Sequence, residues 1–241
     1  MPRPLLIIET GQPLPAMRRH GTFPHWIRVA AGLKQRDVET IDVEHGAPLP
    51  DARSGAGIIV TCSGAMVTDR ADWSERTAAW LRDAAHAGVP MLGICYGHQL
   101  IAHALGGEVG DNPRGREMGT YTISVTEAAT GDALFSAAPA TFPAQTTHLQ
   151  SVLRLPDGAV ALARSALDAH HAFRWRDRVW GVQFHPEFSA THMRGYIRAR
   201  SGPLYREGAD PVALVAAVRA APEARAVLQR FVRTVAMLPQ T

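Results

Sequence analysis

The stretch MLGICYGHQL, residues 91–100, decides the fold. Its first half continues an apolar run that begins at Val89, as in a buried strand, and glycines stand two residues before and two residues after Cys95. This G-x-C-x-G spacing is typical of a tight turn from a strand into a helix, in which the central residue takes a strained backbone conformation. Side chains at the two flanking positions would collide with the neighbouring strand and helix, and glycine removes both collisions. We therefore expect an α/β sheet with Cys95 at the carboxyl end of a strand.

A cysteine on such a turn is placed for chemistry. The first amides of the following helix point at the sulfur, which favours the thiolate and moves the pKa of the thiol below its ordinary value of ~8.5. The N–H of Tyr96 is placed to bond the oxyanion that forms when sulfur attacks a carbonyl. The alternative is a buried structural cysteine, and the isolated motif does not decide between the two. A partner base elsewhere in the chain would decide.

Apolar segments alternate with helical segments before and after this turn, which is the pattern of βαβ units around a mostly parallel sheet. The predicted strands of the first half are residues 5–10, 38–43, 57–62 and 89–95, with predicted helices at 25–35 and 72–88. After residue 107 the predicted strands are 120–126, 146–152, 159–165, 170–175 and 178–184, with little helix between them. From residue 191 onward the chain reads as helices, including 210–220 and 222–238. The predicted fold class is α/β: an open, mostly parallel sheet with helices on both faces, antiparallel additions in the second half, and a helical C-terminal extension over about residues 190–241.

Length and composition exclude several classes of protein. The 241 residues suffice for one α/β core, and we expect residues 1–241 to form a single domain. No segment approaches the ~20 consecutive apolar residues of a membrane span, and the 25 basic residues are scattered among 22 acidic ones, so we expect neither a membrane nor a nucleic-acid partner. The apolar run 5–8 is too short for a signal peptide, and two cysteines make no disulfide framework, which indicates a cytoplasmic location.

The segment VWGVQFHPEFS, residues 179–189, supplies the partner base. Alternation along this strand places His185 at its end, Pro186 fixes the following turn, and Glu187 can swing back to the imidazole. A histidine held by a carboxylate has a set tautomer, and its imidazolium is stabilised once it takes the thiol proton. Cys95, His185 and Glu187 thus form a nucleophile, a base and the residue that orients the base. A strand-end histidine bonded to backbone is the alternative for His185 alone, but the two motifs at strand ends of one sheet favour catalysis.

The segments GICYGHQ (93–99) and GVQFHPE (181–187) together resemble the class I glutamine amidotransferase domain of the Cys-His-Glu type. The intervening ALGGEV (104–109) and PRGREMGTYTISVT (113–126) are similar to the same family, and the resemblance covers about residues 5–189. It implies a flavodoxin-like sheet and hydrolysis of the side-chain amide of glutamine through a γ-glutamyl thioester, with release of ammonia. It also implies that Cys95 is the nucleophile, that His185 is the general base and later the acid, and that Glu187 orients His185.

The resemblance extends to substrate-binding and oxyanion positions. Gln99, one helical turn after Cys95, matches the glutamine that helps to position the substrate. The second oxyanion donor of the family comes from a loop often written G-G-P, which here reads CSGAMV over residues 62–67. Cys62 stands where Gly is usual and Gly64 where Pro is usual, so the donor is the N–H of Ser63 or of Gly64. Cys62 is expected near Cys95, either as a small buried thiol or as the partner in a regulatory disulfide.

The segment THLQSV, residues 147–152, resembles the family's H-G-D-x-V, whose backbone holds the α-amino and α-carboxylate groups of glutamine. His148 is retained, whereas Leu149 replaces Gly and Gln150 replaces Asp. The lost carboxylate could have faced the ammonium group of the substrate, so the change either weakens the selection of free glutamine or is a harmless loop variation. No H-x-x-x-H or C-x-x-C pair is present, and the consecutive His170 and His171 would face opposite sides of a strand, so we expect neither metal nor cofactor.

Three functions are compatible with this sequence. We favour glutamine hydrolysis of the amidotransferase type, as in free-standing members related to the glutaminase domain of GMP synthase. The second is a γ-glutamyl peptidase, in which the acyl half of the substrate is the same and only the leaving group differs. A non-catalytic binding module comes third, because the Cys-His-Glu set is intact. No G-x-x-x-x-G-K-S/T phosphate loop is present, so we expect either a detached glutaminase subunit, with a synthase or ligase subunit as the acceptor of the ammonia, or a hydrolase in its own right.

Overall fold

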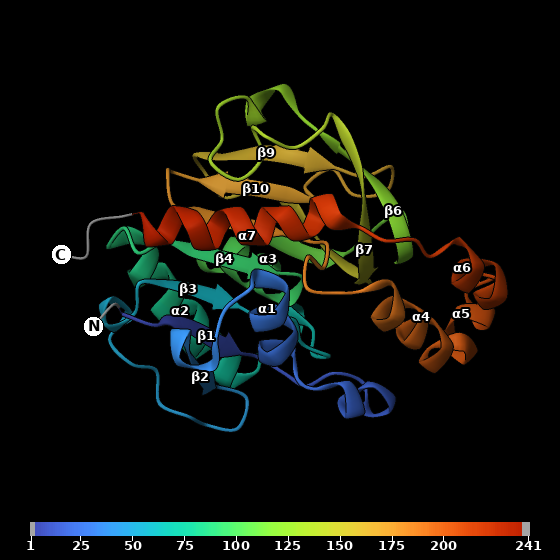
Figure 1. The fold of residues 1–241 in the computed structure, drawn as a ribbon, viewed down its shortest axis with the longest axis horizontal. Coiled ribbons are helices and arrows are strands. Elements are labelled where there is room, and N and C mark those ends of the chain that lie inside the picture. Colours follow the sequence, from blue (N-terminus) through green and yellow to red (C-terminus); the bar gives the residue numbers. More distant parts are fainter. Residues whose placement is uncertain (1–2, 238–241) are drawn as a thin grey trace.

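A nine-stranded sheet in the order β2-β1-β3-β4-β11-β10-β9-β6-β7 forms the centre of the computed structural model, which describes residues 3–237 (Figure 1). A two-stranded sheet, β5-β8, lies beside it. The strands are β1 Leu5–Glu9, β2 Val38–Asp42, β3 Gly57–Val60, β4 Met91–Ile94, β5 Glu108–Asp111, β6 Glu117–Val125, β7 Thr141–His148, β8 Gln150–Arg154, β9 Ala159–Arg164, β10 Ala172–Trp175 and β11 Val179–Val182. The α-helices are α1 Phe23–Ala31, α2 Asp72–His86, α3 Tyr96–Ala104, α4 Ala190–Ala199, α5 Ser201–Arg206, α6 Pro211–Ala217 and α7 Pro222–Ala236. Short 3₁₀ turns are η1 Pro15–His20, η2 Gln35–Asp37, η3 Ala52–Ser54, η4 Val67–Asp69 and η5 Glu127–Ala129.

The sheet has a parallel half and an antiparallel half. Strands β2, β1, β3, β4 and β11 are parallel neighbours, and β10, β9, β6 and β7 continue the sheet in antiparallel pairs. Strands β1, β3, β4 and β11 are buried along their whole length, as expected for parallel strands covered on both faces. The predicted fold class is confirmed, including the antiparallel additions and the C-terminal helices.

Helices cover both faces of the parallel half. Helices α1 and α7 pack against each other on one face, and α7 crosses the front of the sheet in Figure 1. Helices α2 and α3 pack against each other on the opposite face, with α3 against β4 and β11. Helices α4, α5 and α6 form a group beyond one end of the sheet, next to β6 and β7 (Figure 1). This group stands at the end of the sheet where β4 and β11 finish.

Local sequence explains where several elements stop. Helix α1 begins after Thr22, whose side-chain oxygen accepts from the His25 amide, and it ends at Gly32 in the left-handed conformation. The prediction of a helix over 25–35 was therefore wrong at its C-terminal end. The predicted helix 210–220 also ends early, at residue 217, because Val218 is already extended. The last residue of the predicted helix 222–238, Leu238, lies outside the described residues.

The predicted strand 146–152 is two strands. It breaks at Leu149, so that β7 pairs with β6 in the large sheet and β8 pairs with β5 in the small one. The sequence pattern showed no sign of this break, and it missed β5 and the first half of β7 as well. The break is important for function because it places the backbone of residues 147–150 beside the end of β4.

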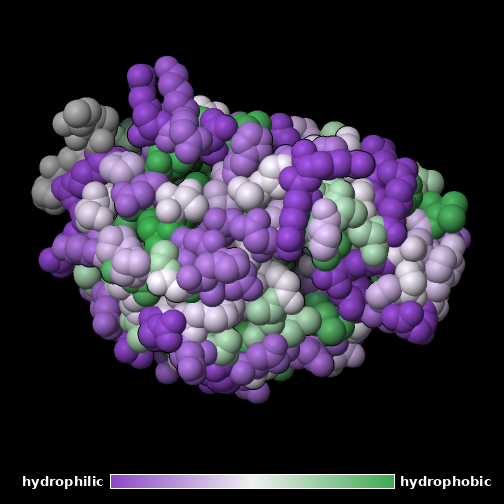
Figure 2. Space-filling model, turned by 90° about the horizontal axis from the view of Figure 1, so that it is seen from below, coloured by the Kyte–Doolittle hydropathy of each residue, from purple (hydrophilic) through white to green (hydrophobic). Residues whose placement is uncertain are grey.

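One face of the molecule is mostly polar. Figure 2 shows one face on which hydrophilic residues dominate and hydrophobic residues lie between them in small groups. Within residues 3–237, no helix combines the length and the apolar character that crossing a bilayer requires.

Candidate active site

Cys95 occupies a strained turn between β4 and α3. Its φ of 54° and ψ of −102° lie outside the regions that residues with a side chain ordinarily adopt. A Cβ on Gly93 would lie 2.6 Å from the His98 amide nitrogen, and one on Gly97 would lie 2.5 Å from the Val60 carbonyl oxygen. Both glycines are therefore required by close backbone contacts, as the G-x-C-x-G spacing predicts.

His185 and Glu187 lie just beyond the end of β11, the strand next to β4. The Nδ1–H of His185 donates to Oε1 of Glu187 at 2.8 Å, and both side chains are fully buried. The backbone N–H of His185 donates to the Gln145 carbonyl at 2.8 Å, which fixes the position of the loop. The ring of Phe188 lies 4.1 Å from the imidazole, centroid to centroid, so the histidine has an aromatic neighbour as well as an acidic one.

Two sulfurs, not one, lie beside the imidazole. The sulfurs of Cys62 and Cys95 and a ring nitrogen of His185 are all within 4.8 Å of one another. Register explains this proximity, because Val60 pairs with Gly93 and the two cysteines follow two residues later on neighbouring strands. Both cysteines are free thiols. The expectation that Cys62 lies near Cys95 is confirmed, and the structure has it as a buried thiol.

Cys62, Cys95 and His185 shift one another's pKa values. Burial by itself lowers the pKa of His185, but the negative charges of Glu187 and of the Cys62 sulfur outweigh burial and raise it to about 10. The hydrogen bond with Cys95 lowers the pKa of the Cys62 thiol to about 5, and the same contact raises the pKa of Cys95. These shifts favour a thiolate at Cys62 and a protonated thiol at Cys95, next to a protonated His185. A thiolate hydrogen-bonded to a second thiol can accept the proton of that thiol.

Backbone amides surround the sulfur of Cys95. The N–H of Tyr96 is the first of α3 and lowers the pKa of both thiols. The Tyr96 hydroxyl is buried and shares a hydrogen bond of 2.6 Å with the Ser74 hydroxyl, so the ring is fixed. Ser63 and Gly64 line the same pocket as Cys95, and the Ser63 hydroxyl accepts from the Ala65 amide at 3.0 Å. Both residues proposed from the sequence for the second oxyanion donor thus stand at the site.

Hydrogen bonds fix the side chains of the glutamines at the site. The side-chain amide of Gln99 donates to the Gln150 carbonyl at 2.7 Å and to the Gln183 side-chain oxygen at 2.9 Å. The side-chain amide of Gln150 donates instead to Thr68 at 2.7 Å and Asp111 at 3.1 Å. Gln99 and Gln150 still line the pocket, as does Leu149 between the two strands.

The His148 side chain belongs to a buried polar cluster behind the pocket. Its ring nitrogens contact Glu117 Oε2 at 2.9 Å and the Gln150 carbonyl at 2.9 Å, and His171 contacts the same Glu117 oxygen at 2.7 Å. Burial alone would raise the pKa of Glu117, but the hydrogen bonds from the two histidines outweigh it and hold the pKa well below its ordinary value. Glu117, His148 and His171 have a donor set that a metal ion accepts, yet the carboxylate already bonds both rings directly. We interpret the cluster as the support that fixes the backbone of residues 147–150.

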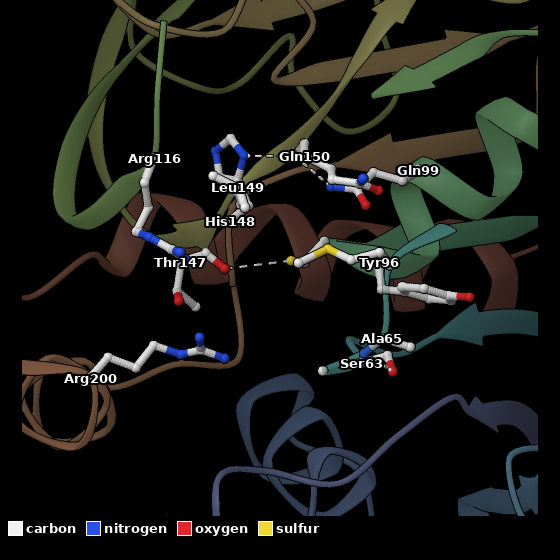
Figure 3. Close-up of a pocket in the computed structure, with 13 residues that line it drawn as sticks. Ser63, Ala65, Tyr96, Gln99, Arg116, Thr147, His148, Leu149, Gln150 and Arg200 are labelled. Carbon is white, nitrogen blue, oxygen red and sulfur yellow. Dashed lines mark hydrogen bonds between the residues drawn. The ribbon is translucent and has the colours of Figure 1, made fainter. Parts of the chain in front are cut away.

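A small pocket opens onto Cys95 (Figure 3). It is lined by Ser63, Gly64, Ala65, Met66, Cys95, Tyr96, Gln99, Arg116, Thr147, His148, Leu149, Gln150 and Arg200. The carbonyl of Thr147 accepts from the thiol of Cys95 at 3.9 Å. No prediction from the sequence placed Arg116 or Arg200 at the pocket. Arg116 lies in the family-like segment 113–126, just before β6, and Arg200 reaches the pocket through the packing of α4 and α5.

Comparison with known proteins gives consistent matches. Residues 27–201 match the family model described as glutamine amidotransferase class-I. One of the subunits of a glutamine-hydrolysing GMP synthase from Archaeoglobus fulgidus is 32% identical over 70% of this chain and 85% of that protein. A γ-glutamyl-L-1-hydroxyisopropylamide hydrolase from a Pseudomonas species is 30% identical over 63% of this chain and 54% of that protein.

Other relatives are longer. A GMP synthase from Thermomicrobium roseum is 42% identical over 46% of this chain, and the match spans only 20% of that protein. Among solved structures, a glutamine amidotransferase from Thermotoga maritima has a TM-score of 0.75 and 17% identity over 99% of this chain and all of that one. At that identity the likeness shows the fold alone.

Proposed function

The chain belongs to the class-I glutamine amidotransferase family, and from this premise we propose that it hydrolyses the side-chain amide of glutamine through a γ-glutamyl thioester on Cys95. The observation that carries the proposal is the cluster of Cys95, His185 and Glu187 at the ends of two adjacent strands. Sulfur, imidazole and carboxylate stand in the order that covalent catalysis by a thiol needs.

The first half of the reaction forms the thioester. The Cys95 thiol first passes its proton to the Cys62 thiolate, with which it is hydrogen-bonded. The Cys95 thiolate then attacks the amide carbon of the substrate, and the N–H of Tyr96 together with one amide of the Ser63–Gly64 turn bonds the resulting oxyanion. His185 donates its proton to the departing nitrogen as the C–N bond breaks, so ammonia leaves as a neutral molecule. Glu187 keeps the imidazole oriented and stabilises its positive charge.

The second half regenerates the thiol. His185, now neutral, takes a proton from water, and the hydroxide attacks the thioester carbon. The C–S bond breaks, glutamate leaves, and the Cys95 sulfur takes its proton back from Cys62. Gln99 and the backbone of residues 148–150 hold the amino acid part of the substrate, supported from behind by Glu117.

A partner follows from this chemistry. Ammonia is useful only where an acceptor receives it, and one relative is named as part of a GMP synthase made of separate subunits. We propose that the acceptor is a synthase or ligase subunit. The two free thiols also favour a reducing compartment such as the cytoplasm.

The decisive experiment measures ammonia released from glutamine by the purified chain and by its Cys95→Ser variant. We expect release by the first and none by the second, with the two proteins equal in thermal stability. Ammonia release that survives the substitution would exclude Cys95 as the nucleophile. If the chain alone is inactive, the same assay with a captured synthase subunit tests activation by the partner.

γ-Glutamyl hydrolysis is the second candidate, and one observation favours it. Arg116 and Arg200 line the pocket, and a leaving group larger than ammonia could reach their guanidinium groups. One relative is named as a hydrolase of a γ-glutamyl amide. Rates on glutamine and on γ-glutamyl compounds, measured side by side, separate the two candidates.

A further inference from the structure

Two arginines form one wall of the pocket that contains Cys95. Arg116 precedes β6, and Arg200 stands between α4 and α5, far apart in the sequence. Figure 3 shows both reaching toward Thr147 on one side of the pocket, while Tyr96, Ala65 and Ser63 lie on the other side. Among residues 3–237, no aspartate or glutamate lines this pocket. The wall is therefore positively charged and faces the reacting sulfur.

The two arginines differ in how they are held. Arg116 bonds Glu207 through two parallel contacts, Nε to Oε2 at 2.8 Å and Nη2 to Oε1 at 3.0 Å, and its side chain is 15% exposed. Arg200 has a buried Nε with no hydrogen-bond partner among the described residues. A guanidinium without an acceptor is costly to bury, so the part of the Arg200 side chain that lines the pocket is suited to bind an anion.

The local balance of charge points the same way. Glu207 is the carboxylate near this wall, and the charges of Arg116, Arg200 and Arg206 all act on it and lower its pKa. One acid against three guanidinium groups leaves an excess of positive charge. Guanidinium groups bind carboxylates in a planar, two-pronged geometry, which makes a carboxylate the natural ligand.

The position of Arg116 and Arg200 in the pocket determines which part of a substrate they can contact. In the proposed reaction the acyl half occupies the space between Cys95, Gln99 and residues 148–150, and the oxyanion faces Tyr96 and residues 63–64. The remaining side, beyond Thr147, belongs to the leaving group. We propose that Arg200, with Arg116, binds a carboxylate carried by the leaving amine, so that the preferred substrates are γ-glutamyl amino acids or γ-glutamyl peptides.

This inference rests on the proposed thioester chemistry and names its substrate class. The Cys95 thiolate attacks the γ-carbonyl carbon, the C–N bond breaks, and the amine nitrogen of the departing amino acid takes the proton of His185. Water then hydrolyses the thioester to glutamate, as with glutamine. The carboxylate on the wall takes no part in bond making, so Arg116 and Arg200 determine specificity and are not catalytic residues.

The test compares kcat/KM for three compounds: γ-glutamylglycine, γ-glutamylglycinamide and glutamine. The first two differ only in the leaving-group carboxylate, and all three carry the same α-carboxylate. We expect the acid to be preferred over the amide by about 10-fold to 100-fold, the range that one charged hydrogen bond gives. In Arg200→Gln this ratio falls to about 1, and Arg200→Lys restores part of it. Arg198→Gln is the matched control, because Arg198 is exposed on α4 and does not line the pocket.

Each outcome has one meaning. If acid and amide are hydrolysed equally well by the unchanged protein, the inference is wrong, while turnover of glutamine leaves the proposed function standing. If Arg200→Gln lowers the rates on all three compounds equally, the arginine binds the shared α-carboxylate and the leaving-group assignment is wrong. If none of the three is hydrolysed, with or without a partner subunit, the proposed function fails and the inference with it. Thermal melting of each variant shows whether a loss of rate reflects a loss of folding.

Discussion

Replacing Gly93 by alanine tests whether the elbow needs glycine for the reason given above. The added Cβ would lie 2.6 Å from the His98 amide nitrogen and closer still to the Gly97 carbonyl, whereas ordinary contacts of a Cβ begin at 3.4 Å. Both neighbours are backbone of α3, so no side chain can rotate away. Helix α3 must withdraw from β4 by roughly 1 Å, a displacement that can cost about 100-fold in rate at a reacting atom. Forced overpacking of this kind costs about 1–3 kcal/mol in the free energy of unfolding.

Two assays measure these effects. Urea unfolding followed by tryptophan fluorescence gives the change in stability, and ammonia release from glutamine gives the change in kcat. Gly202→Ala is the control, because its Cβ would meet only the end of the Arg206 side chain at 3.7 Å, within α5. We expect Gly93→Ala to lose both stability and rate, and Gly202→Ala to lose neither. A Gly93→Ala protein as stable and as active as the unchanged chain would refute the steric account of the motif.

Three further predictions concern buried titratable groups. Burial and the charge of Asp42 raise the pKa of Glu9 to about 7. Folding therefore binds a proton between pH 4.5 and 7, and the free energy of unfolding falls as the pH rises through that window. In urea unfolding, we expect Glu9→Gln to raise the free energy of unfolding by on the order of 2 kcal/mol at pH 8 and to have little effect at about pH 4.5. The thiolate of Cys62, which is hydrogen-bonded to Cys95, should give an absorbance change at 240 nm with an inflection near pH 5. Because the pKa of this thiol is ~8.5 in the unfolded chain and about 5 in the folded one, stability should fall as the pH drops from ~8.5 to 5 and change no further below 5; an unchanged curve in Cys62→Ala would count against a thiolate at Cys62. Glu117→Gln removes the carboxylate that both His148 and His171 contact and should lower the free energy of unfolding by about 3–5 kcal/mol, whereas the same change at the exposed Glu108 of β5 should not.

Local pattern was enough to find the elements that hold the proposed chemistry. Cys95 and His185 each end a short apolar strand, and the glycine spacing around Cys95 reflects backbone contacts that are fixed by the local turn. His185 was expected directly after a strand over 178–184, and it lies three residues beyond Val182, the last residue of β11. These features depend on residues close together in sequence or on the common edge of a parallel sheet, and both are visible in the chain itself.

The pocket wall could not be predicted in the same way. Arg200 reaches the pocket because α4 and α5 pack beyond the end of the sheet, and that packing depends on contacts between distant segments. Leu149 interrupts a run that otherwise reads as one strand, and only the pairing of β8 with β5 reveals the break. The closeness of Cys62 to Cys95 is an intermediate case, because it follows from the register of β3 against β4 once the sheet order is known.

The helical extension and the sheet make separate contributions to the pocket, and this separation has an evolutionary consequence. The residues proposed for bond breaking stand on the rim of the central sheet, where any shift of a strand disturbs all of them together. The guanidinium of Arg200 comes from a peripheral turn between two short helices, which can drift in sequence without moving that rim. Related proteins can therefore acquire new substrate preferences through substitutions in this turn alone. A protein engineer who seeks a different substrate would begin with the turn between α4 and α5.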